Sequence, residues 1–282
     1  MDHKLIIHGG FFSESGTNLE IKLAKQEALS DIVQRSYQYL SSHSALETTV
    51  FAVSLLEDCE LFNAGFGSQI QSDGKIRLSA GLMDGHSGKF SGVINIEDVR
   101  NPIQIAEKLM SIDDRVLSCR GALDFARSNG FEYFNPETPQ RREEYEKKLS
   151  VSSRLGTVGC VAIDNKGNIA AATSTGGKGF EIPGRVSDSA TSAGNFASQF
   201  AGISCTGVGE DIVSAGLAVK IGTRVSDGMS LEAASHKSFQ ELKLSDGFAG
   251  IIGISANGEI YHCDSHPYMV WAAYDGRLSV FE

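Results

Sequence analysis

The chain has 282 residues, 41% of them hydrophobic and 21% charged, which is enough to bury a substantial core in one large domain or two small ones. Its formal net charge of −10 disfavours nucleic acid and anionic membranes as partners, because an acidic surface repels phosphate groups. Its five cysteines are odd in number, lie far apart and include no CxxC pair, so they imply neither a disulfide framework nor a structural zinc site.

The first predicted element is a short buried strand from Lys4 to His8, which runs into Gly9-Gly10. Its apolar run is too short for a signal peptide, and no stretch of the chain reaches the roughly 20 apolar residues that span a membrane, so we expect a cytoplasmic protein. Helical periodicity follows, and Ser44 and Glu47 have the spacing of a capping box. The helices expected in this half cover about 19–41, 44–56, 101–109 and 118–127.

Residues 62–93 differ from these helical segments, because Gly, Asn, Asp and Ser alternate with short apolar runs. This pattern predicts strands joined by tight turns. Residues 132–153 form a connector that contains Pro136, Pro139 and a charged run from 141 to 148. The connector has no clear apolar stripe, so we expect a solvated, mobile connection, with an exposed helix as an equally good interpretation of its charged part.

After the connector the pattern becomes strand-like. Two apolar runs, 158–163 and 169–172, flank an Asn/Gly turn and predict a hairpin, and a similar hairpin is expected over 250–262. Two helices are expected between the hairpins, at about 210–221 and 231–242. Hairpins favour antiparallel sheets, and the helices must cover the outer faces of these sheets, so the sequence predicts an α+β fold.

The junction between the connector and the first hairpin, Gly156-Thr157, has the composition of a self-cleavage site. Glycine leaves its carbonyl accessible to the Thr157 hydroxyl, and an N-to-O acyl shift followed by ester hydrolysis would expose a new N-terminal threonine. The α-amine of such a threonine has an ordinary pKa of ~7.7–8, so it can act as a general base near neutrality. The alternative is a threonine that merely begins a strand, where this residue is common.

Two further stretches carry polar residues suited to such a site. Thr175 ends the strand expected to pair with the Thr157 strand, so its hydroxyl could reach Thr157, although it could equally be a polar strand end. Arg185 and Asp188 offer one cation and one anion for the carboxylate and the ammonium group of an amino acid. Their alternative is to pair with each other on a surface loop.

Two glycine-containing turns complete the set. Thr206 and Gly207 lie at a predicted strand-to-helix transition, where backbone N–H groups could form an oxyanion hole, bind phosphate or simply make a turn. Asn63 lies in a glycine-rich turn, where its amide could donate to a catalytic hydroxyl or form a structural Asx turn.

Taken together and in this order, the five stretches make the chain similar to the plant-type asparaginase / isoaspartyl peptidase family of N-terminal nucleophile hydrolases. The similarity runs from His8-Gly9-Gly10 through Met83-Asp84-Gly85 and Arg100-Asn101-Pro102 to the segment 268–271, and only the connector matches poorly. It implies one domain with a four-layer αββα sandwich of two antiparallel sheets flanked by helices.

The resemblance also implies maturation and assembly. Self-cleavage would divide the single domain, 1–282, into an α subunit of residues 1–156 and a β subunit of residues 157–282, and two such αβ units would form a dimer. The implied catalytic residues are Thr157 as nucleophile, Thr175 as the threonine that positions it, Thr206 and Gly207 as donors to the oxyanion, and Asn63 as a contact of the nucleophile. The implied substrate-binding residues are Arg185 for the α-carboxylate, Asp188 with Gly209 for the α-ammonium group, and Gly207.

No cofactor is required by this resemblance, but it implies a structural sodium ion held by main-chain oxygens of one loop. The loop residues are Leu56, Glu57, Cys59, Phe62, Ala64 and Phe66. Departures from the family are Phe11-Phe12 and Ser79, Ser187 where glycine is usual, and Val208 where threonine is frequent. These departures bear on substrate preference and on the rate of cleavage rather than on the reaction class.

The sequence therefore predicts an enzyme that hydrolyses β-aspartyl dipeptides and L-asparagine and releases aspartate. One alternative is a glycosylasparaginase-like hydrolase of sugar-linked asparagine, against which Gly156 argues, because that branch usually carries Asp at this position. The other is an uncleaved, inactive relative that binds aspartate, against which the intact set of polar residues argues.

Overall fold

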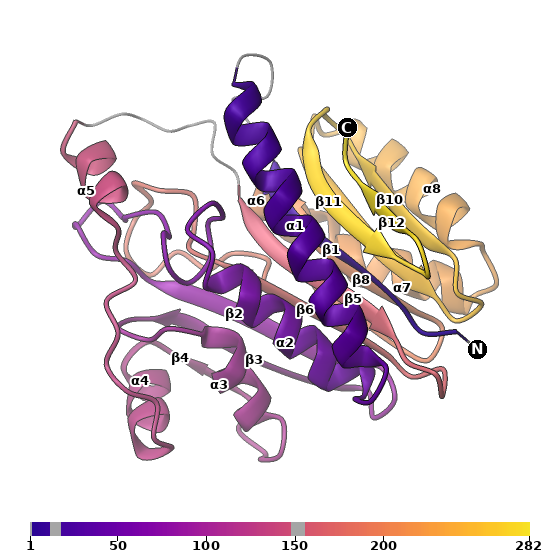
Figure 1. Cartoon of the computed structure of the whole chain (residues 1–282), viewed down its shortest axis with the longest axis horizontal. Helices are drawn as coiled ribbons and strands as arrows, with labels where there is room; N and C mark the ends of the chain where they lie inside the picture. The colour runs from indigo at the N-terminus through magenta and orange to yellow at the C-terminus, as the bar shows by residue number, and fades with distance from the viewer. Residues whose placement is uncertain (1, 12–17, 148–155) are drawn as a thin grey trace.

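The computed structural model describes residues 2–11, 18–147 and 156–282, and every structural statement below concerns these residues. Phe12 and residues 148–153 of the predicted connector lie outside them. Within the described part of the chain, two β-sheets pack against each other and helices flank them (Figure 1), which is an α+β arrangement as predicted.

The larger sheet has eight strands among the described residues, in the order β12-β11-β1-β5-β6-β2-β3-β4. In chain order they are β1 Lys4–Phe11, β2 Leu78–Asp84, β3 Lys89–Ile96, β4 Val116–Ser118, β5 Thr157–Ile163, β6 Ile169–Thr175, β11 Met269–Tyr274 and β12 Leu278–Val280. The central pair β5 and β6 is the first predicted hairpin, and Asp164 closes its turn by accepting from Lys166 N at 2.9 Å and from Asn168 N at 3.0 Å. Both strands are buried along their whole length, so this hairpin lies in the middle of the molecule.

The smaller sheet has the order β10-β9-β8-β7. Its strands are β7 Asn195–Ala197, β8 Ala201–Gly207, β9 Ala249–Ser255 and β10 Ile260–Asp264, and the β9–β10 pair confirms the second predicted hairpin. Apolar side chains such as Ile6, Val161 and Ile252 fill the space between the two sheets. Strand β8 packs against β5 and β6, which brings the ends of these three strands together.

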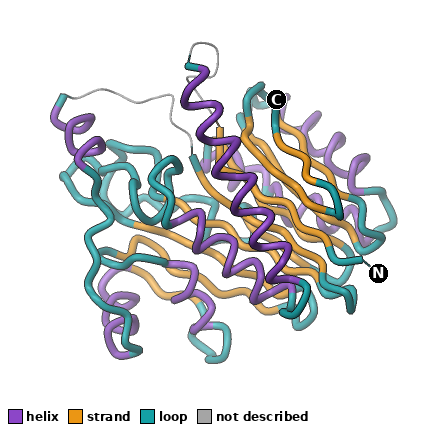
Figure 2. The backbone as a smooth tube through the Cα atoms, in the orientation of Figure 1, coloured by secondary structure: helices purple, strands orange, loops and turns teal. Residues whose placement is uncertain are grey.

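Helices cover the outer faces of both sheets (Figure 2 shows them in purple over the orange strands). The large sheet is covered by α1 Leu19–Leu40, α2 Ala45–Glu57, α3 Pro102–Leu109 and α4 Cys119–Ser128, and the small sheet by α7 Leu217–Ser226 and α8 Leu231–Lys243. The predicted capping box of α2 is confirmed, because Glu47 N donates to Ser44 Oγ at 3.3 Å and Ser44 N donates to Glu47 Oε2 at 2.9 Å. Among the described residues, no helix combines the length and the apolarity that a membrane span needs.

Three details of the predicted fold are wrong. The helix expected over 210–221 is broken into α6 Gly209–Ala215 and α7, because Gly216 takes a left-handed conformation with φ of 56°. The large sheet is not wholly antiparallel, since β4 pairs with β3 in parallel after a crossover through α3. The strands expected from residue 62 onward begin only at Leu78, and the residues before it form a loop.

The connector is the largest correction. Its charged part forms a helix, α5 Pro139–Glu146, as one of the two interpretations predicted, but two of its charged side chains, Arg141 and Glu144, are only 8% exposed. Arg141 Nη1 donates to Glu144 Oε2 at 2.9 Å, and Arg141 Nε donates to the carbonyl of Gly67 at 2.6 Å. This part of the connector is therefore docked on the loop that follows α2 rather than solvated, because a buried ion pair and a main-chain carbonyl satisfy its guanidinium.

Candidate active site

Thr157 is the first residue of β5 and directly follows Gly156. The β5–β6 register sets Thr157 opposite Thr175, and the Thr157 hydroxyl donates to Thr175 Oγ1 at 3.2 Å. Thr175 Oγ1 in turn accepts from Gly177 N at 3.2 Å, which fixes its orientation. Both threonines are almost fully buried, at 7% and 3% exposure. The hairpin predicted from sequence thus brings the two predicted hydroxyls into direct contact.

Thr206 and Gly207 approach this pair from the other sheet, at the end of β8. Thr206 is fully buried, and its hydroxyl has no hydrogen-bond partner within the described residues. Gly207 has a φ of 135°, and a Cβ at this position would lie 2.5 Å from the carbonyl oxygen of Phe248. The backbone can turn here only because residue 207 is glycine. A buried hydroxyl without a partner is costly, so Thr206 is suited to receive a ligand atom.

Arg185, Asp188 and Gly209 converge beside these residues. A Cβ on Gly209 would lie 2.9 Å from each of Arg185 Nη2, Asp188 Oδ1 and Ser187 Oγ, so Gly209 and the segment 185–188 meet where only glycine fits. Arg185 does not pair with Asp188. It instead binds Glu210 through two hydrogen bonds, Nε to Oε1 at 2.7 Å and Nη2 to Oε2 at 2.8 Å, so the alternative of a mutual surface pair is wrong.

The two acidic groups, Glu210 and Asp188, differ in the direction of their pKa shifts. The hydrogen bonds from Arg185 lower the pKa of Glu210 to about 2, so this carboxylate stays ionised. Burial raises the pKa of Asp188 from its ordinary 3.8 to about 6, although the hydroxyl of Ser187 donates to its Oδ1 at 2.8 Å. The other oxygen of Asp188 has no hydrogen-bond partner within the described residues. At neutral pH Asp188 is therefore a buried anion with one unoccupied oxygen, which suits a cationic ligand.

Glu210 was present in the predicted strand-to-helix segment but received no role from sequence reasoning. The signal that could have identified it is an acidic residue directly after Gly209, because a partly exposed carboxylate can accept two hydrogen bonds from a partly buried guanidinium and hold it in place. Its distance of 25 residues from Arg185 in the chain hides the pairing.

Known proteins resemble this chain over almost its whole length. A sequence model of a family described as "Asparaginase" matches residues 1–280. The chain belongs to this asparaginase family. A protein named "Isoaspartyl peptidase/L-asparaginase" from Synechocystis sp. is 43% identical, over 98% of this chain and 89% of its own length. An "Isoaspartyl peptidase" from Escherichia coli is 36% identical over 91% and 88%, and a "Plant-type L-asparaginase" from Pyrococcus furiosus is 35% identical over 95% of each chain.

Asn63, predicted to contact the nucleophile of this asparaginase-family site, is held by the loop around it. Its Nδ2 donates to the carbonyl of Gly177 at 2.5 Å, and its Oδ1 accepts from Gln69 N at 2.9 Å. A Cβ on Gly156 would lie 2.9 Å from the Asn63 Cβ, so Asn63 packs directly against the residue before the nucleophile. The contact with Thr157 itself stays a prediction.

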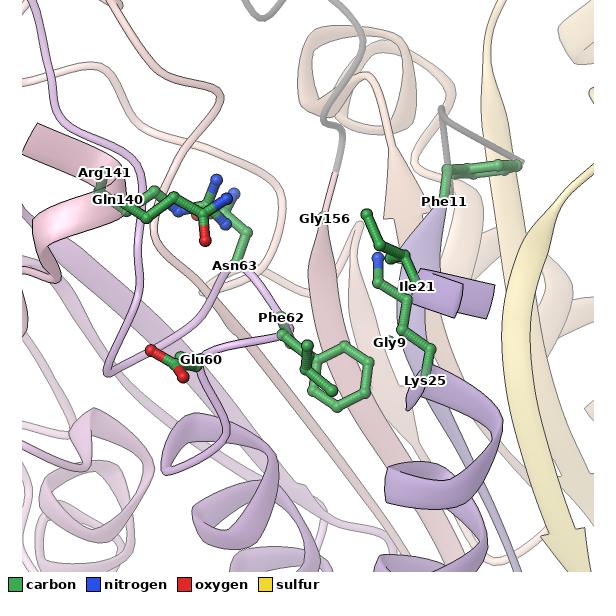
Figure 3. A pocket seen from close by; sticks show the side chains of 11 residues that line it. Gly9, Phe11, Ile21, Lys25, Glu60, Phe62, Asn63, Gln140, Arg141 and Gly156 are labelled. Atoms are coloured by element: carbon green, nitrogen blue, oxygen red, sulfur yellow. The ribbon is translucent and has the colours of Figure 1, made fainter. Parts of the chain in front are cut away.

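A cavity of about 160 Å³ opens beside Gly156. Figure 3 shows Asn63, Gln140 and Arg141 on one side of it and Phe11, Ile21 and Lys25 on the other. The remaining lining residues are Gly9, Glu60, Leu61 and Phe62. The residue before the predicted nucleophile thus borders open space rather than packed core.

The loop predicted to bind sodium curls on itself between α2 and β2. The carbonyl of Leu56 accepts from Cys59 N at 3.3 Å, that of Glu57 from Phe66 N at 2.7 Å, and that of Cys59 from Phe62 N at 3.1 Å. A carbonyl oxygen has two lone pairs, so these bonds leave the loop compatible with a hard cation. The described residues contain no metal-binding cluster of three or more His, Cys, Asp or Glu side chains, and a main-chain site requires none.

Four of the residues that depart from the family pattern, Phe11, Ser79, Ser187 and Val208, lie in the described part of the chain. Phe11 is 6% exposed and packs edge-on against Phe248, at 4.5 Å between ring centres. Ser187 donates to Asp188, and Ser79 Oγ accepts from Asn95 N at 3.0 Å on the strand position opposite Thr175. Val208 lies where β8 passes into α6, and nothing in the structure explains its side chain. These substitutions line the predicted site without removing any of its polar groups.

Proposed function

We propose that this chain is a self-cleaving threonine amidohydrolase that hydrolyses β-aspartyl dipeptides and L-asparagine and releases aspartate. The observation that carries the proposal is the Thr157 hydroxyl, 3.2 Å from Thr175 Oγ1, at the first position of a central strand directly after Gly156. The names of the relatives support the substrate class, because they combine isoaspartyl peptidase and asparaginase.

Maturation begins when Thr157 Oγ1 attacks the carbonyl carbon of Gly156. The C–N bond breaks as the acyl group moves to oxygen, and the nitrogen takes a proton to become the α-amine of Thr157. Water then hydrolyses the ester, leaving a carboxylate on Gly156 and restoring the hydroxyl. The cavity beside Gly156 gives this water a route to the bond.

The two products, residues 1–156 and 157–282, stay associated because their strands interleave. In the large sheet β1 lies between β11 and β5, and β6 pairs with β2, so each fragment supplies strands on both sides of the other. Separating them would break the ladders of the central sheet. We propose that the product is one domain, a four-layer αββα sandwich, and that two αβ units form the dimer.

In turnover the free α-amine of Thr157 accepts the hydroxyl proton while Oγ1 attacks the side-chain amide carbon of the substrate. Charge that develops on the amide oxygen is stabilised by Thr206 and Gly207, whose strand end faces Thr157 across the sheets. Thr175 holds the nucleophile by its hydrogen bond. The leaving amine takes the proton, and water hydrolyses the β-aspartyl ester to release aspartate and regenerate Thr157.

Substrate recognition uses one cation and one anion. Arg185 is held by Glu210 through Nε and Nη2, so the Nη1 side of its guanidinium is directed to the substrate α-carboxylate. Asp188, ionised at neutral pH, binds the α-ammonium group with the backbone of Gly209. The leaving group is not bound by these residues, which accounts for activity on both the amide and the dipeptide.

The structural sodium ion of the loop 56–66 and a cytoplasmic location are parts of this proposal that rest on the sequence. The glycosylasparaginase branch is the second candidate in the same reaction class. An inactive aspartate-binding relative is the third. A substrate panel separates the three, because only the first hydrolyses β-aspartyl dipeptides.

The test is turnover of β-aspartyl-leucine, L-asparagine and a sugar-linked asparagine by the wild type and by Thr157→Ala. We expect the wild type to hydrolyse the first two, and Thr157→Ala to lose both activities and self-cleavage because the attacking oxygen is gone. Thr175→Ser, which keeps a hydroxyl, is the matched control and should retain measurable activity. Persistent turnover in Thr157→Ala would refute the nucleophile assignment.

A further inference from the structure

A second row of polar residues lies behind the three threonines. Side chains two positions apart on a strand point to the same face. On β6 Thr173 precedes Thr175 by two positions, and on β8 Ser204 precedes Thr206 by two. The neighbouring strand β1 adds His8, which lies opposite Gly159 of β5. All three side chains are 0% exposed.

These side chains form one hydrogen-bonded chain. His8 Nε2 is 2.9 Å from Ser204 Oγ, and Ser204 Oγ is 2.7 Å from Thr173 Oγ1. Thr173 Oγ1 also donates to the carbonyl of Gly194, at 3.4 Å. His8 and Thr173 belong to the large sheet and Ser204 to the small sheet, so the chain crosses between the sheets. The nearby contacts between the two sheets are apolar. Because the hydrophobic effect has no preferred direction, these contacts alone do not fix how one sheet is placed over the other.

Gly159 gives this chain its space. A Cβ on residue 159 would lie 2.0 Å from Ser204 Oγ and 2.4 Å from His8 Nε2, distances at which no side chain can be accommodated. The second glycine of Gly156-Thr157-Val158-Gly159 is thus explained by the contact that it permits. The segment 156–159, which contains the predicted cleavage site, therefore also leaves the space that the His8 side chain occupies.

The imidazole of His8 is a neutral group at physiological pH. Burial lowers its pKa to about 3, partly opposed by the nearby backbone of Thr157. Nδ1 makes no hydrogen bond within the described residues, so the Thr157 backbone is a close neighbour of the ring and not a bonded partner. A neutral ring has one donor and one acceptor nitrogen, so it can link to a hydroxyl without adding charge beside the nucleophile.

We propose that His8 is a positioning residue, which through Ser204 and Thr173 fixes the separation between Thr157 on the large sheet and Thr206 on the small sheet. This inference rests on the proposed function, in which those two threonines supply the nucleophile and the oxyanion donor. The nucleophile and the oxyanion donors belong to different sheets, so their distance depends on how the sheets are held. A shift of about 1 Å in such a distance can lower a rate on the order of 100-fold.

The test measures kcat, KM and the rate constant of self-cleavage for the wild type, Ser204→Ala, His8→Leu and His8→Gln. Ser204→Ala removes the central link, His8→Leu removes the ring, and the amide of His8→Gln can restore a bond to Ser204. We expect kcat and self-cleavage to fall roughly 10- to 100-fold in Ser204→Ala and His8→Leu. KM should stay within about twofold, because Arg185 and Asp188 are untouched, and His8→Gln should recover much of the rate.

The matched control is Ser91→Ala, which removes another fully buried hydroxyl, one that donates to the carbonyl of Ala106 at 2.6 Å between β3 and α3. It should lower the melting temperature as Ser204→Ala does while leaving kcat unchanged. Equal kcat in Ser204→Ala, Ser91→Ala and the wild type would overturn the positioning role alone. A wild type that neither cleaves itself nor hydrolyses β-aspartyl substrates would overturn the proposed function, and the positioning role with it.

Discussion

Two arginine–glutamate pairs in this molecule illustrate the difference between a closed site and an open one. Arg141 is bonded on one side to Glu144 and on the other to the carbonyl of Gly67, and both side chains of the pair are buried. Arg185 is only partly buried, with 14% of its side chain exposed, and both of its side-chain hydrogen bonds go to Glu210, whose side chain is 50% exposed. In the first pair, Arg141 attaches the connector to the rest of the fold. In the second pair, Glu210 binds one edge of the Arg185 guanidinium and leaves its other side available to a ligand.

Breaking the closed pair should affect the fold and not turnover. Arg141→Met removes the guanidinium that bonds both the buried Glu144 carboxylate and the Gly67 carbonyl, which should weaken the docking of α5 by about 3 kcal/mol. Hydrogen exchange of the α5 amides, residues 139–146, measures this loss, and kcat of the matured enzyme should be unchanged. Exchange as slow as in the wild type would contradict the role given to Arg141.

Changing the open pair should have the opposite result. Arg185→Lys keeps the charge but loses the planar, two-pronged contact, so kcat/KM should fall about 100-fold with most of the change in KM. The melting temperature should change little, because the role proposed for Arg185 is to bind a ligand. Arg141→Lys is the matched control, and it should leave kcat/KM unaltered. Equal effects of the two substitutions on kcat/KM would remove the distinction between the pairs.

The anion beside the open pair should make substrate binding depend on pH. Burial raises the pKa of Asp188 to about 6, and only the ionised form binds an ammonium group. KM should therefore rise roughly tenfold for each pH unit below 6 and be constant above it. The same shift should make the free energy of unfolding larger at low pH. The folded state holds the proton of Asp188 more tightly than the unfolded state does, so this contribution to stability is present below pH 3.8 and is lost as the pH rises to about 6. A flat KM between pH 5 and 7, read from initial rates, would contradict this assignment.

The smallest expected effect is that of Glu210→Gln. The amide still occupies the outer edge of Arg185 but accepts only one of the two hydrogen bonds, so KM should rise roughly 3- to 10-fold while kcat is maintained. Lys178, whose Nζ lies 3.4 Å from Glu210 Oε1, supplies the control, because Lys178→Gln changes the local charge without touching Arg185. A larger rise in KM in Lys178→Gln than in Glu210→Gln would mean that the charge near Arg185, and not its positioning by Glu210, determines KM.

Local pattern was sufficient to predict part of this site. The hairpin over β5 and β6 follows from two apolar runs around an Asp/Asn/Gly turn, and its register alone sets Thr157 opposite Thr175. The capping box at Ser44 and the second hairpin are local features of the same kind. The α+β arrangement then follows, because the helices have no other faces to cover.

Contacts between distant segments account for what the sequence did not predict. Glu210 pairs with Arg185 from 25 residues further along the chain, whereas Asp188 is the acid nearer to Arg185 in the sequence. The charged run of the connector has no apolar stripe, yet Gly67 and Glu144 satisfy its Arg141. No local pattern indicates the contact of His8, since its partner Ser204 is 196 residues away.

The most direct test of the account is intact-mass spectrometry of the purified chain after incubation at neutral pH, with N-terminal sequencing of any fragments. We predict two fragments divided after Gly156, the smaller beginning with Thr157-Val158-Gly159. Thr157→Ala, treated identically, should stay whole. A wild-type chain that remains a single species after prolonged incubation, or a cut at any other bond, would contradict the assignment of Thr157 as the nucleophile.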